Sequence, residues 1–401
     1  MSRFVICSLL LALLAGCRAP KADQPAPLKL GTYGPLSGPA ASWGVMLKAM
    51  SAYIDYINAQ GGLHGRKLEL VIRDDQYNPA KTPLVVRDLV ENEQVFAIVG
   101  GLGTANGRSV IDYLQQKAVP FFTPASGDPF FTQPPRPNVY TVYPRYDTEG
   151  QIIGQHLARA LGKKRVAVMH QDDDFGLKGA EGLKAGLQAF GAELVLSTTC
   201  QPSDTDVSAQ ARLIADAQAD ALVLFTAPRQ AAMLVKRLTT LKAKPPVFTS
   251  FVLSDPIMFE LAGQEVWEGT MTSSVRKLSN SEDPSVVQYR EVLAAHGPGL
   301  EVGSFTMSGF AFAQPFVEAL HRAGPQPNPA KVYEALHGMK DWASGGPYWR
   351  GTGLNPPLSF SADDHLGNDR IFFAKAEKGR WNRVTDWIGL SPPPATSPDQ
   401  E

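Results

Sequence analysis

Three loops of the sequence combine glycine, proline and small hydroxyl residues, which are suited to holding a small polar ligand. The loops span residues 34–39 with Trp43 just beyond, residues 100–107, and residues 123–129. Glycine lets the backbone approach a ligand closely, and the hydroxyls of Thr104 and Ser126 can lie beside free N–H groups at the start of a helix. Together the loops predict a site for a carboxylate or an amide, although tight turns alone also explain any single loop.

The second loop approximates a dinucleotide-binding glycine pattern through Gly101, Gly103 and Gly107. That pattern requires an acidic residue about 20 positions further on and a place directly after the first strand. Residues 121–123 contain no acid, and the loop follows the third predicted strand. No nucleotide cofactor is therefore expected.

Motifs of catalysis and metal binding are missing from the sequence. It contains no Gly-x-Ser-x-Gly elbow, no His-Glu-x-x-His and no cysteine pair, and its seven histidines are scattered. The three aspartates at 172–174 lack the ligand spacing of a calcium loop, so we interpret them as a strand-end turn that caps the next helix. No catalysis, cofactor or metal is expected, and an exported hydrolase is an alternative without a candidate nucleophile.

Short apolar segments alternate with helical patterns along most of the chain. Strands are predicted at 28–33, 68–72, 95–99 and 119–122, with helices after Trp43 and at 83–90 and 109–116. Beyond the proline-rich residues 134–144, helices are predicted at about 148–161, 176–190, 207–217, 230–241, 284–295 and 306–323, and strands at 165–169, 193–196, 221–225, 247–250, 370–374 and 381–387. This order predicts an α/β fold of two lobes, each with a parallel sheet covered on both faces.

The first residues have the pattern of an export signal. Arg3 precedes an apolar run at 4–14, which is long enough for a signal but short for a membrane span. The run ends in Leu-Ala-Gly-Cys at 14–17, which resembles the bacterial lipobox and predicts removal of residues 1–16 and lipid attachment to Cys17. Ordinary secretion is the alternative. The small, polar and proline-containing composition of residues 17–27 predicts a tether between the lipid and the folded domain. The composition of residues 391–401, rich in Pro, Ser and Ala, predicts a disordered tail.

The cysteines and the net charge narrow the possible partners. With Cys7 in the signal and Cys17 lipidated, Cys200 is the one thiol of the folded body, so no disulfide is expected within the chain. Cys200 is expected to be buried or inert. The formal net charge of -1 is not the basic excess typical of nucleic-acid-binding proteins. A small neutral or zwitterionic ligand is compatible with this composition.

Five motifs along the chain resemble the Leu/Ile/Val-binding protein family of periplasmic solute receptors. They lie at residues 34–38 (GPLSG), 57–65 (INAQGGLHG), 74–75 (DD), 147–150 (DTEG) and 173–176 (DDFG). The resemblance covers residues 28–390 and implies the type I periplasmic binding fold, in which two doubly wound parallel-sheet lobes are joined by three crossovers. We place the crossovers near Pro144, near Ser274 and at 348–357. The first lobe would then contain residues 28–144 and 275–350, and the second residues 145–274 and 351–390.

The resemblance also implies a function. It implies a monomeric solute-binding component of an ABC importer, in the periplasm or cell envelope, which closes on a small molecule and delivers it to a membrane permease. A lipid-anchored sensor or interaction protein with the same fold is the alternative that the sequence leaves open.

Matched by position, the resemblance assigns ligand contacts to the strand-end loops. Thr104 matches a hydroxyl that contacts the carboxylate and amino group of the ligand, and Ala125 matches a backbone donor. Trp43 matches a residue beside the ligand's side chain, and Phe175 an aromatic residue that closes over it. The expected ligand-binding residues are Trp43, Leu102, Gly103, Thr104, Ala125, Ser126, Gly127, Tyr146, Phe175 and Phe251.

Two positions depart from the family pattern. Gly127 stands where the family has a hydroxyl, and the acid that pairs with the ammonium of an amino acid falls on or beside Val252. Ser126 and Asp255 are the candidate substitutes. The expected ligand is therefore an amino-acid-like compound, an amide, or an aromatic or apolar carboxylate.

Overall fold

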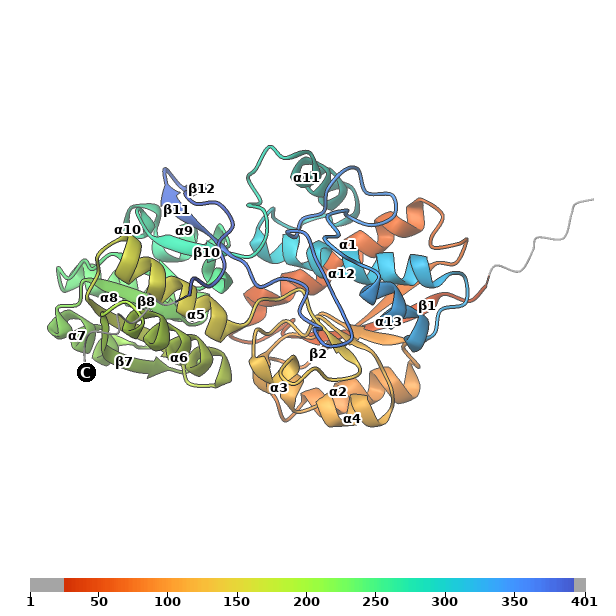
Figure 1. The fold of residues 1–401 in the computed structure, drawn as a ribbon, viewed down its shortest axis with the longest axis horizontal. Helices are drawn as coiled ribbons and strands as arrows, with labels where there is room; N and C mark the ends of the chain where they lie inside the picture. The colour runs from red at the N-terminus through yellow and green to blue at the C-terminus, as the bar shows by residue number, and fades with distance from the viewer. Residues whose placement is uncertain (1–24, 393–401) are drawn as a thin grey trace, which may run out of the picture.

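The described part of the chain forms two α/β lobes that lie side by side (Figure 1). The structure is a computed structural model, and it describes residues 25–392. The predicted signal peptide at 1–16, the lipidation site Cys17, most of the tether at 17–27 and all but two residues of the tail at 391–401 lie outside the described residues.

The first lobe is built around a five-stranded sheet in the order β2-β1-β3-β4-β5, in which all pairs are parallel. Its strands are β1 (Leu28–Gly34), β2 (Leu68–Asp74), β3 (Ala97–Val99), β4 (Phe121–Phe122) and β5 (Val139–Tyr140). Its helices are α1 (Ala41–Ala59), α2 (Thr82–Arg87), α3 (Thr104–Arg108), α4 (Ile111–Gln116), α11 (Pro284–His296), α12 (Ser304–Ala323) and α13 (Pro329–His337). The late helix α12 packs against α1, so the chain returns to this lobe after building the other.

The second lobe has a seven-stranded sheet in the order β12-β11-β10-β9-β8-β6-β7. Its strands are β6 (Arg165–Gln171), β7 (Glu193–Cys200), β8 (Ala221–Phe225), β9 (Val247–Thr249), β10 (Met271–Ser274), β11 (Phe372–Glu377) and β12 (Arg380–Arg383). Its helices are α5 (Tyr146–Gln155), α6 (Asp174–Gln188), α7 (Ser208–Ala217), α8 (Pro228–Thr240), α9 (Ile257–Ala262) and α10 (Gln264–Trp267). Strands β6 to β10 are parallel, which confirms the predicted parallel-sheet lobes.

The edge of the second sheet differs from the prediction. Strands β11 and β12 run antiparallel to their neighbours and form a hairpin, with Glu377 opposite Arg380. The two loop residues between them, Lys378 and Gly379, have φ of 55° and 73°. A two-residue hairpin turn with two positive φ angles matches the right-handed twist of the strands. The turn places the start of β12 at Arg380, and the strand ends at Arg383, four residues before the predicted end at 387.

Several short helices replace single predicted ones. The helix predicted at 83–90 is α2 followed by a π-helical turn, η1 (Asp88–Asn92). The helix predicted at 109–116 is preceded by α3, which begins at Thr104, so the second half of the loop predicted at 100–107 is helical. Helix α5 continues into a π-helical turn, η3 (His156–Ala160), and 3-10 turns lie at η2 (Pro129–Phe131) and η4 (Phe251–Leu253).

The chain crosses between the lobes at three places. The first crossover follows β5 and the second follows β10. The third lies later than the predicted 348–357, because residues of that stretch remain bound to the first lobe. Asn355 Nδ2 donates to Ala311 O at 2.7 Å, and Thr141 N donates to His365 O at 3.0 Å. Irregular loops held by scattered hydrogen bonds carry no periodic pattern, so the sequence did not indicate their place.

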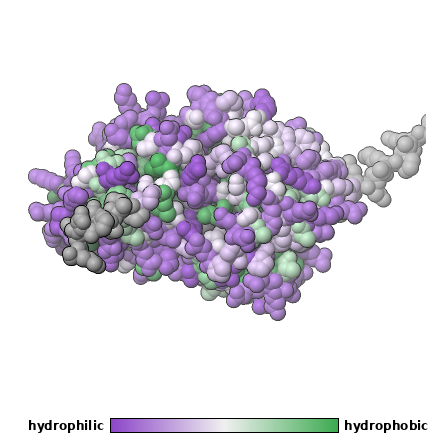
Figure 2. All heavy atoms as spheres, viewed as in Figure 1, coloured by the Kyte–Doolittle hydropathy of each residue, from purple (hydrophilic) through white to green (hydrophobic). Residues whose placement is uncertain are grey.

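The face of the molecule seen in Figure 2 has few large apolar areas. On the face shown in Figure 2, hydrophilic residues predominate and hydrophobic residues form small groups. Between residues 25 and 392, no helix is long and apolar enough to cross a membrane.

Helices α5 and α6 approach each other more closely than side chains normally allow. An added Cβ at Gly182 would lie 2.1 Å from Asp147 O, one at Gly150 would lie 2.2 Å from Gly179 O, and one at Gly186 would lie 2.2 Å from Gln151 O. Glycine at these positions removes the obstruction, so the two backbones pack directly against each other. This contact fixes how closely the two helices lie beside each other.

We predict that Gly182→Ala destabilises the protein by about 1–3 kcal/mol, because its methyl group would overlap a backbone carbonyl that cannot rotate away. Urea unfolding measures the change. Gly338→Ala is the matched control, since the nearest atom to its Cβ is 3.4 Å away and its φ is -75°. The control should be as stable as the parent protein or slightly more stable. Equal stability of Gly182→Ala and the parent would contradict the proposed close contact.

Candidate functional site

The carboxyl ends of the central strands of both sheets face one cavity between the lobes. The cavity has a volume of about 60 Å³ and is lined by loops and helix starts of both lobes. In parallel sheets this is the place where loops and helix N-termini converge. A larger open depression of about 640 Å³ lies elsewhere, among residues 132–145 and 356–370, and its walls are mainly polar loops without converging strand ends.

Most of the residues predicted to bind a ligand meet at this cavity. Those that line it are Trp43, Leu102, Gly103, Thr104, Ala125, Tyr146, Phe175 and Phe251. They come from helix α1, the loops after β3, β4 and β9, and the first residues of α5 and α6. The second and third predicted loops therefore each contribute residues to the cavity.

Two predicted residues do not line the cavity. Ser126 lies behind it, where its hydroxyl bonds Thr104 Oγ1 at 2.8 Å and accepts from Asp128 N. Gly127 contacts the first crossover instead: its carbonyl accepts from Tyr146 N at 2.7 Å, and an added Cβ would lie 2.2 Å from Pro144 O. A hydroxyl side chain at Gly127 would therefore collide with the backbone.

The first predicted loop, residues 34–39, has a structural role. Leu36 N and Ser37 Oγ both donate to the carboxylate of Asp74, at 2.9 and 2.6 Å. The loop is thus tied to the end of β2, and only Trp43, beyond it, lines the cavity.

Nine lining residues were not predicted from the sequence. They are Met46, Tyr77, Tyr143, Val252, Arg276, Ser304, Phe305, Ser308 and Phe312. Ser304, Ser308 and Phe312 follow one another every four residues and therefore lie on one face of α12. That spacing was visible in the sequence, but it points to the cavity only once α12 is known to return to the first lobe.

Aromatic rings make up much of the wall. The ring centroids of Trp43 and Tyr77 are 5.3 Å apart, and those of Tyr146 and Phe175 are 4.7 Å apart. Phe251 reaches across from the second lobe to Tyr143, with centroids 4.8 Å apart and nearly perpendicular rings. Such pairs favour an apolar or aromatic guest.

The arginine in this wall, Arg276, is almost fully buried. The residue is 4% exposed, Nη1 donates to Ser308 Oγ, and Nε has no hydrogen-bond partner among residues 25–392. The guanidinium lies 5.2 Å from the centroid of the Phe312 ring. Burial lowers the pKa of Arg276 to about 10, so the group remains protonated at neutral pH.

The buried acids close to the cavity have partners of their own. Asp255 accepts from Ile257 N at 2.9 Å and from Phe305 N at 2.8 Å, and it does not line the cavity. Glu149 of α5 accepts from Phe251 N at 2.8 Å, from Ser250 Oγ at 2.9 Å and from Ser273 Oγ. Its carboxylate thereby holds the turn η4, on which Phe251 sits.

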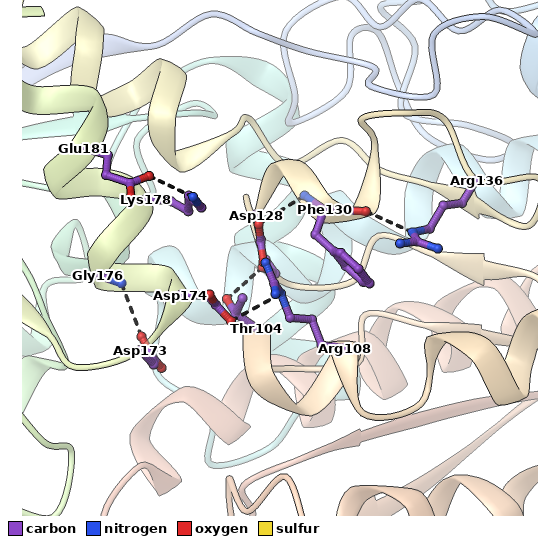
Figure 3. A network of polar contacts seen from close by, with 11 residues as sticks. Thr104, Arg108, Asp128, Phe130, Arg136, Asp173, Asp174, Gly176, Lys178 and Glu181 are labelled. Atoms are coloured by element: carbon purple, nitrogen blue, oxygen red, sulfur yellow. Dashed lines mark hydrogen bonds and ion pairs between the residues drawn. The ribbon is translucent and has the colours of Figure 1, made fainter. Parts of the chain in front are cut away.

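An ion pair joins the lobes at the rim of the cavity (Figure 3). Arg108 of α3 donates through Nε to Asp128 of its own lobe at 2.6 Å and lies 3.3 Å from Asp174 Oδ2 at the start of α6. Nearby, Gln171 Nε2 donates to the Tyr77 hydroxyl at 3.4 Å. The two lobes are therefore in contact at two places beside the cavity.

Two smaller predictions are confirmed. Asp173 caps α6 by accepting from Gly176 N at 3.2 Å, as expected for the aspartates at 172–174. Cys200 is buried, and burial raises the pKa of its thiol to about 11.

Across the part of the chain that the structure describes, no group of three or more His, Cys, Asp or Glu side chains is placed to hold a metal ion.

Known proteins share this architecture. A family model described as periplasmic binding protein matches residues 27–380. The Leu/Ile/Val-binding protein BraC3 of Rhizobium johnstonii is 25% identical over 317 residues, which cover 79% of this chain and 85% of that protein.

Two solved structures show the same fold. A branched-chain amino acid ABC transporter protein from Thermus thermophilus with bound valine has a TM-score of 0.81 at 21% identity, covering 91% of this chain and 97% of that one. A solute-binding protein of an ABC transporter from R. palustris, in complex with benzoate, has a TM-score of 0.79 at 19% identity, covering 91% and 98%. These likenesses confirm the predicted two-lobed fold.

The buried Glu149 predicts a pH-dependent stability. Burial raises the pKa of Glu149 to about 7, and this effect outweighs the hydrogen bonds from Ser273, Phe251 and Ser250, which lower it. The folded protein therefore retains a proton that the unfolded chain releases near pH 4.5, so stability is full below that pH and declines as the pH rises through about 7.

We expect the unfolding free energy of the parent protein to fall, between pH 5 and pH 8, on the order of 2 kcal/mol more than that of Glu149→Gln. Urea unfolding at several pH values measures this difference. The exposed Glu301→Gln is the matched control and should follow the parent. Parallel pH profiles for the parent and Glu149→Gln would contradict the assignment.

Proposed function

Since the chain belongs to the periplasmic binding protein family, we propose that it is the solute-binding component of an ABC importer and holds a small molecule in the cavity between its lobes. The observation that carries this proposal is the cavity itself, in which residues from the strand ends of both sheets converge. The family acts outside the cytoplasm, and the predicted signal and lipidation at Cys17 would anchor this chain to a membrane there.

Closure of the lobes on the ligand is the proposed mode of binding. Trp43 and Thr104 belong to the first lobe, and Phe175 and Phe251 to the second, so a ligand in the cavity contacts both. The ion pair between Arg108 and Asp174 forms only while the lobes are together. A ligand that contacts both lobes favours this closed arrangement and shifts the population toward it. The closed form would then be recognised by the membrane permease.

The ligand is proposed to be an amino-acid-like compound, an amide, or an aromatic or apolar carboxylate. Relatives of the same fold were crystallised with valine and with benzoate, so the fold accommodates both kinds of molecule. The aromatic wall and the hydroxyl of Thr104 suit each of these classes. No catalytic role is proposed for any residue.

We expect Trp43→Ala and Thr104→Ala each to weaken ligand binding by at least about 1 kcal/mol, through lost packing and a lost hydrogen bond. Isothermal calorimetry with amino acids, amides and aromatic acids measures the affinities. Thr240→Ala, an exposed threonine on α8, is the control and should bind as the parent does. Unchanged affinity in both cavity variants would refute the placement of the site. Failure of all the amino acids, amides and aromatic acids to bind would count against solute binding.

A further inference from the structure

We infer that the ligand is a carboxylate with an apolar body and no ammonium group, and that Arg276 pairs with its carboxylate. This inference rests on the proposed function, because it takes the cavity between the lobes as the ligand site.

The first step is that Arg276 lacks a partner for its charge. A guanidinium has five N–H donors, and a buried one is normally paired with a carboxylate or fully hydrogen-bonded. Arg276 is 4% exposed, its Nε has no hydrogen-bond partner in the described part of the chain, and Nη1 donates to the neutral hydroxyl of Ser308. No carboxylate of residues 25–392 forms an ion pair with it or contributes to its pKa. The free protein therefore carries a buried, uncompensated positive charge in the cavity wall.

The second step is that the rest of the cavity wall is uncharged. Of the described residues that line it, only Arg276 bears a formal charge at neutral pH. The nearby acids accept hydrogen bonds from other groups. Glu149 accepts from Ser250, Ser273 and the backbone of Phe251, and Asp255 accepts from the backbone of Phe305. An anionic ligand would therefore neutralise the charge of Arg276, which no group of the cavity wall does.

The third step excludes an ammonium group. The α-ammonium of an amino acid would enter a closed cavity with a cation and without an acid, and an unpaired buried charge is costly. An amide would leave the guanidinium uncompensated. A carboxylate without an ammonium neutralises Arg276 and forms charge-assisted hydrogen bonds, which are stronger than neutral ones.

The fourth step concerns the body of the ligand. Arg276 lies beside the Phe312 ring, and the wall beyond it is formed by the rings of Trp43, Tyr77, Tyr143 and Phe251. These faces can bury an aliphatic or aromatic group but offer few hydrogen bonds. The lining therefore suits an apolar monocarboxylate held at one end by Arg276, and the lobes must move apart to admit it, because the cavity has a volume of about 60 Å³ in the present arrangement.

Matched ligand sets test the inference on the parent protein. Calorimetry would compare 3-phenylpropionate with phenylalanine and 3-phenylpropanamide, and 4-methylpentanoate with leucine and 4-methylpentanamide. Each set keeps the apolar body and changes only the polar end. We expect at least one carboxylate to bind about tenfold or more tightly than its amino acid and its amide. An amino acid or amide that binds as tightly as its carboxylate would overturn the inference while leaving the proposed function intact.

Variants of Arg276 test the assigned contact. Arg276→Met removes the charge at similar length and should weaken carboxylate binding about tenfold or more, with little effect on the amide. Arg276→Lys keeps the charge and should retain part of the affinity. Arg350→Met, an exposed arginine on the first lobe, is the matched control and should bind normally. Circular dichroism verifies folding, and if Arg276→Met does not fold, the lysine variant and the ligand sets decide.

The failures of the two proposals are distinguishable. Full carboxylate affinity in folded Arg276→Met would overturn the role of Arg276. Failure of every carboxylate to bind would overturn the ligand class. If, in addition, amino acids and amides fail to bind and native mass spectrometry finds no small molecule on the purified protein, solute binding itself fails.

Discussion

The direct contact between the backbones of α5 and α6 is the constraint on which the second lobe's side of the cavity depends. Both helices begin at the cavity, with Tyr146 in the first turn of α5 and Phe175 in the first turn of α6. Without Cβ atoms at Gly150 and Gly182, the helices lie close enough for these two rings to touch. Gly127 extends the same principle to the crossover, since its lack of a side chain lets the chain pass into α5. Packing far from the ligand therefore sets the shape of the wall.

The polarity of the cavity depends on which of the buried charged side chains around it are hydrogen-bonded to other parts of the protein. Glu149 and Asp255 are each satisfied by hydrogen bonds from neighbouring turns, so they stabilise the frame and contribute no charge to the lining. Among residues 25–392, the guanidinium of Arg276 has Ser308 as its one hydrogen-bond partner. A buried charge without a counter-charge costs stability, and its presence in the wall of a cavity is typical of a group whose partner is a bound molecule.

Local sequence patterns identified the parts of the site that are local in the chain. Thr104 and Ala125 follow strands directly, so a strand prediction and a glycine loop place them at the carboxyl ends. Arg276 and Ser308 are separated by a crossover and helix α11, and their meeting depends on how α12 packs against α1, which no spacing reveals. The third crossover and the antiparallel hairpin were missed or mislocated for a related reason: irregular loops lack periodicity, and the direction of a strand depends on its tertiary partner.

The ion pair at the rim bears on how quickly a bound molecule can leave. When the lobes separate, Arg108 keeps Asp128, whose side chain is 1% exposed, so opening leaves no buried carboxylate without a partner. Only Asp174 loses its contact; it is one-third exposed and sits in the first turn of α6, where water and the helix dipole stabilise its charge. Breaking the rim contact therefore costs little free energy. The lifetime of the closed state is then governed by the contacts between the ligand and the cavity wall. The dissociation rate therefore depends more on the ligand than on the ion pair between Arg108 and Asp174.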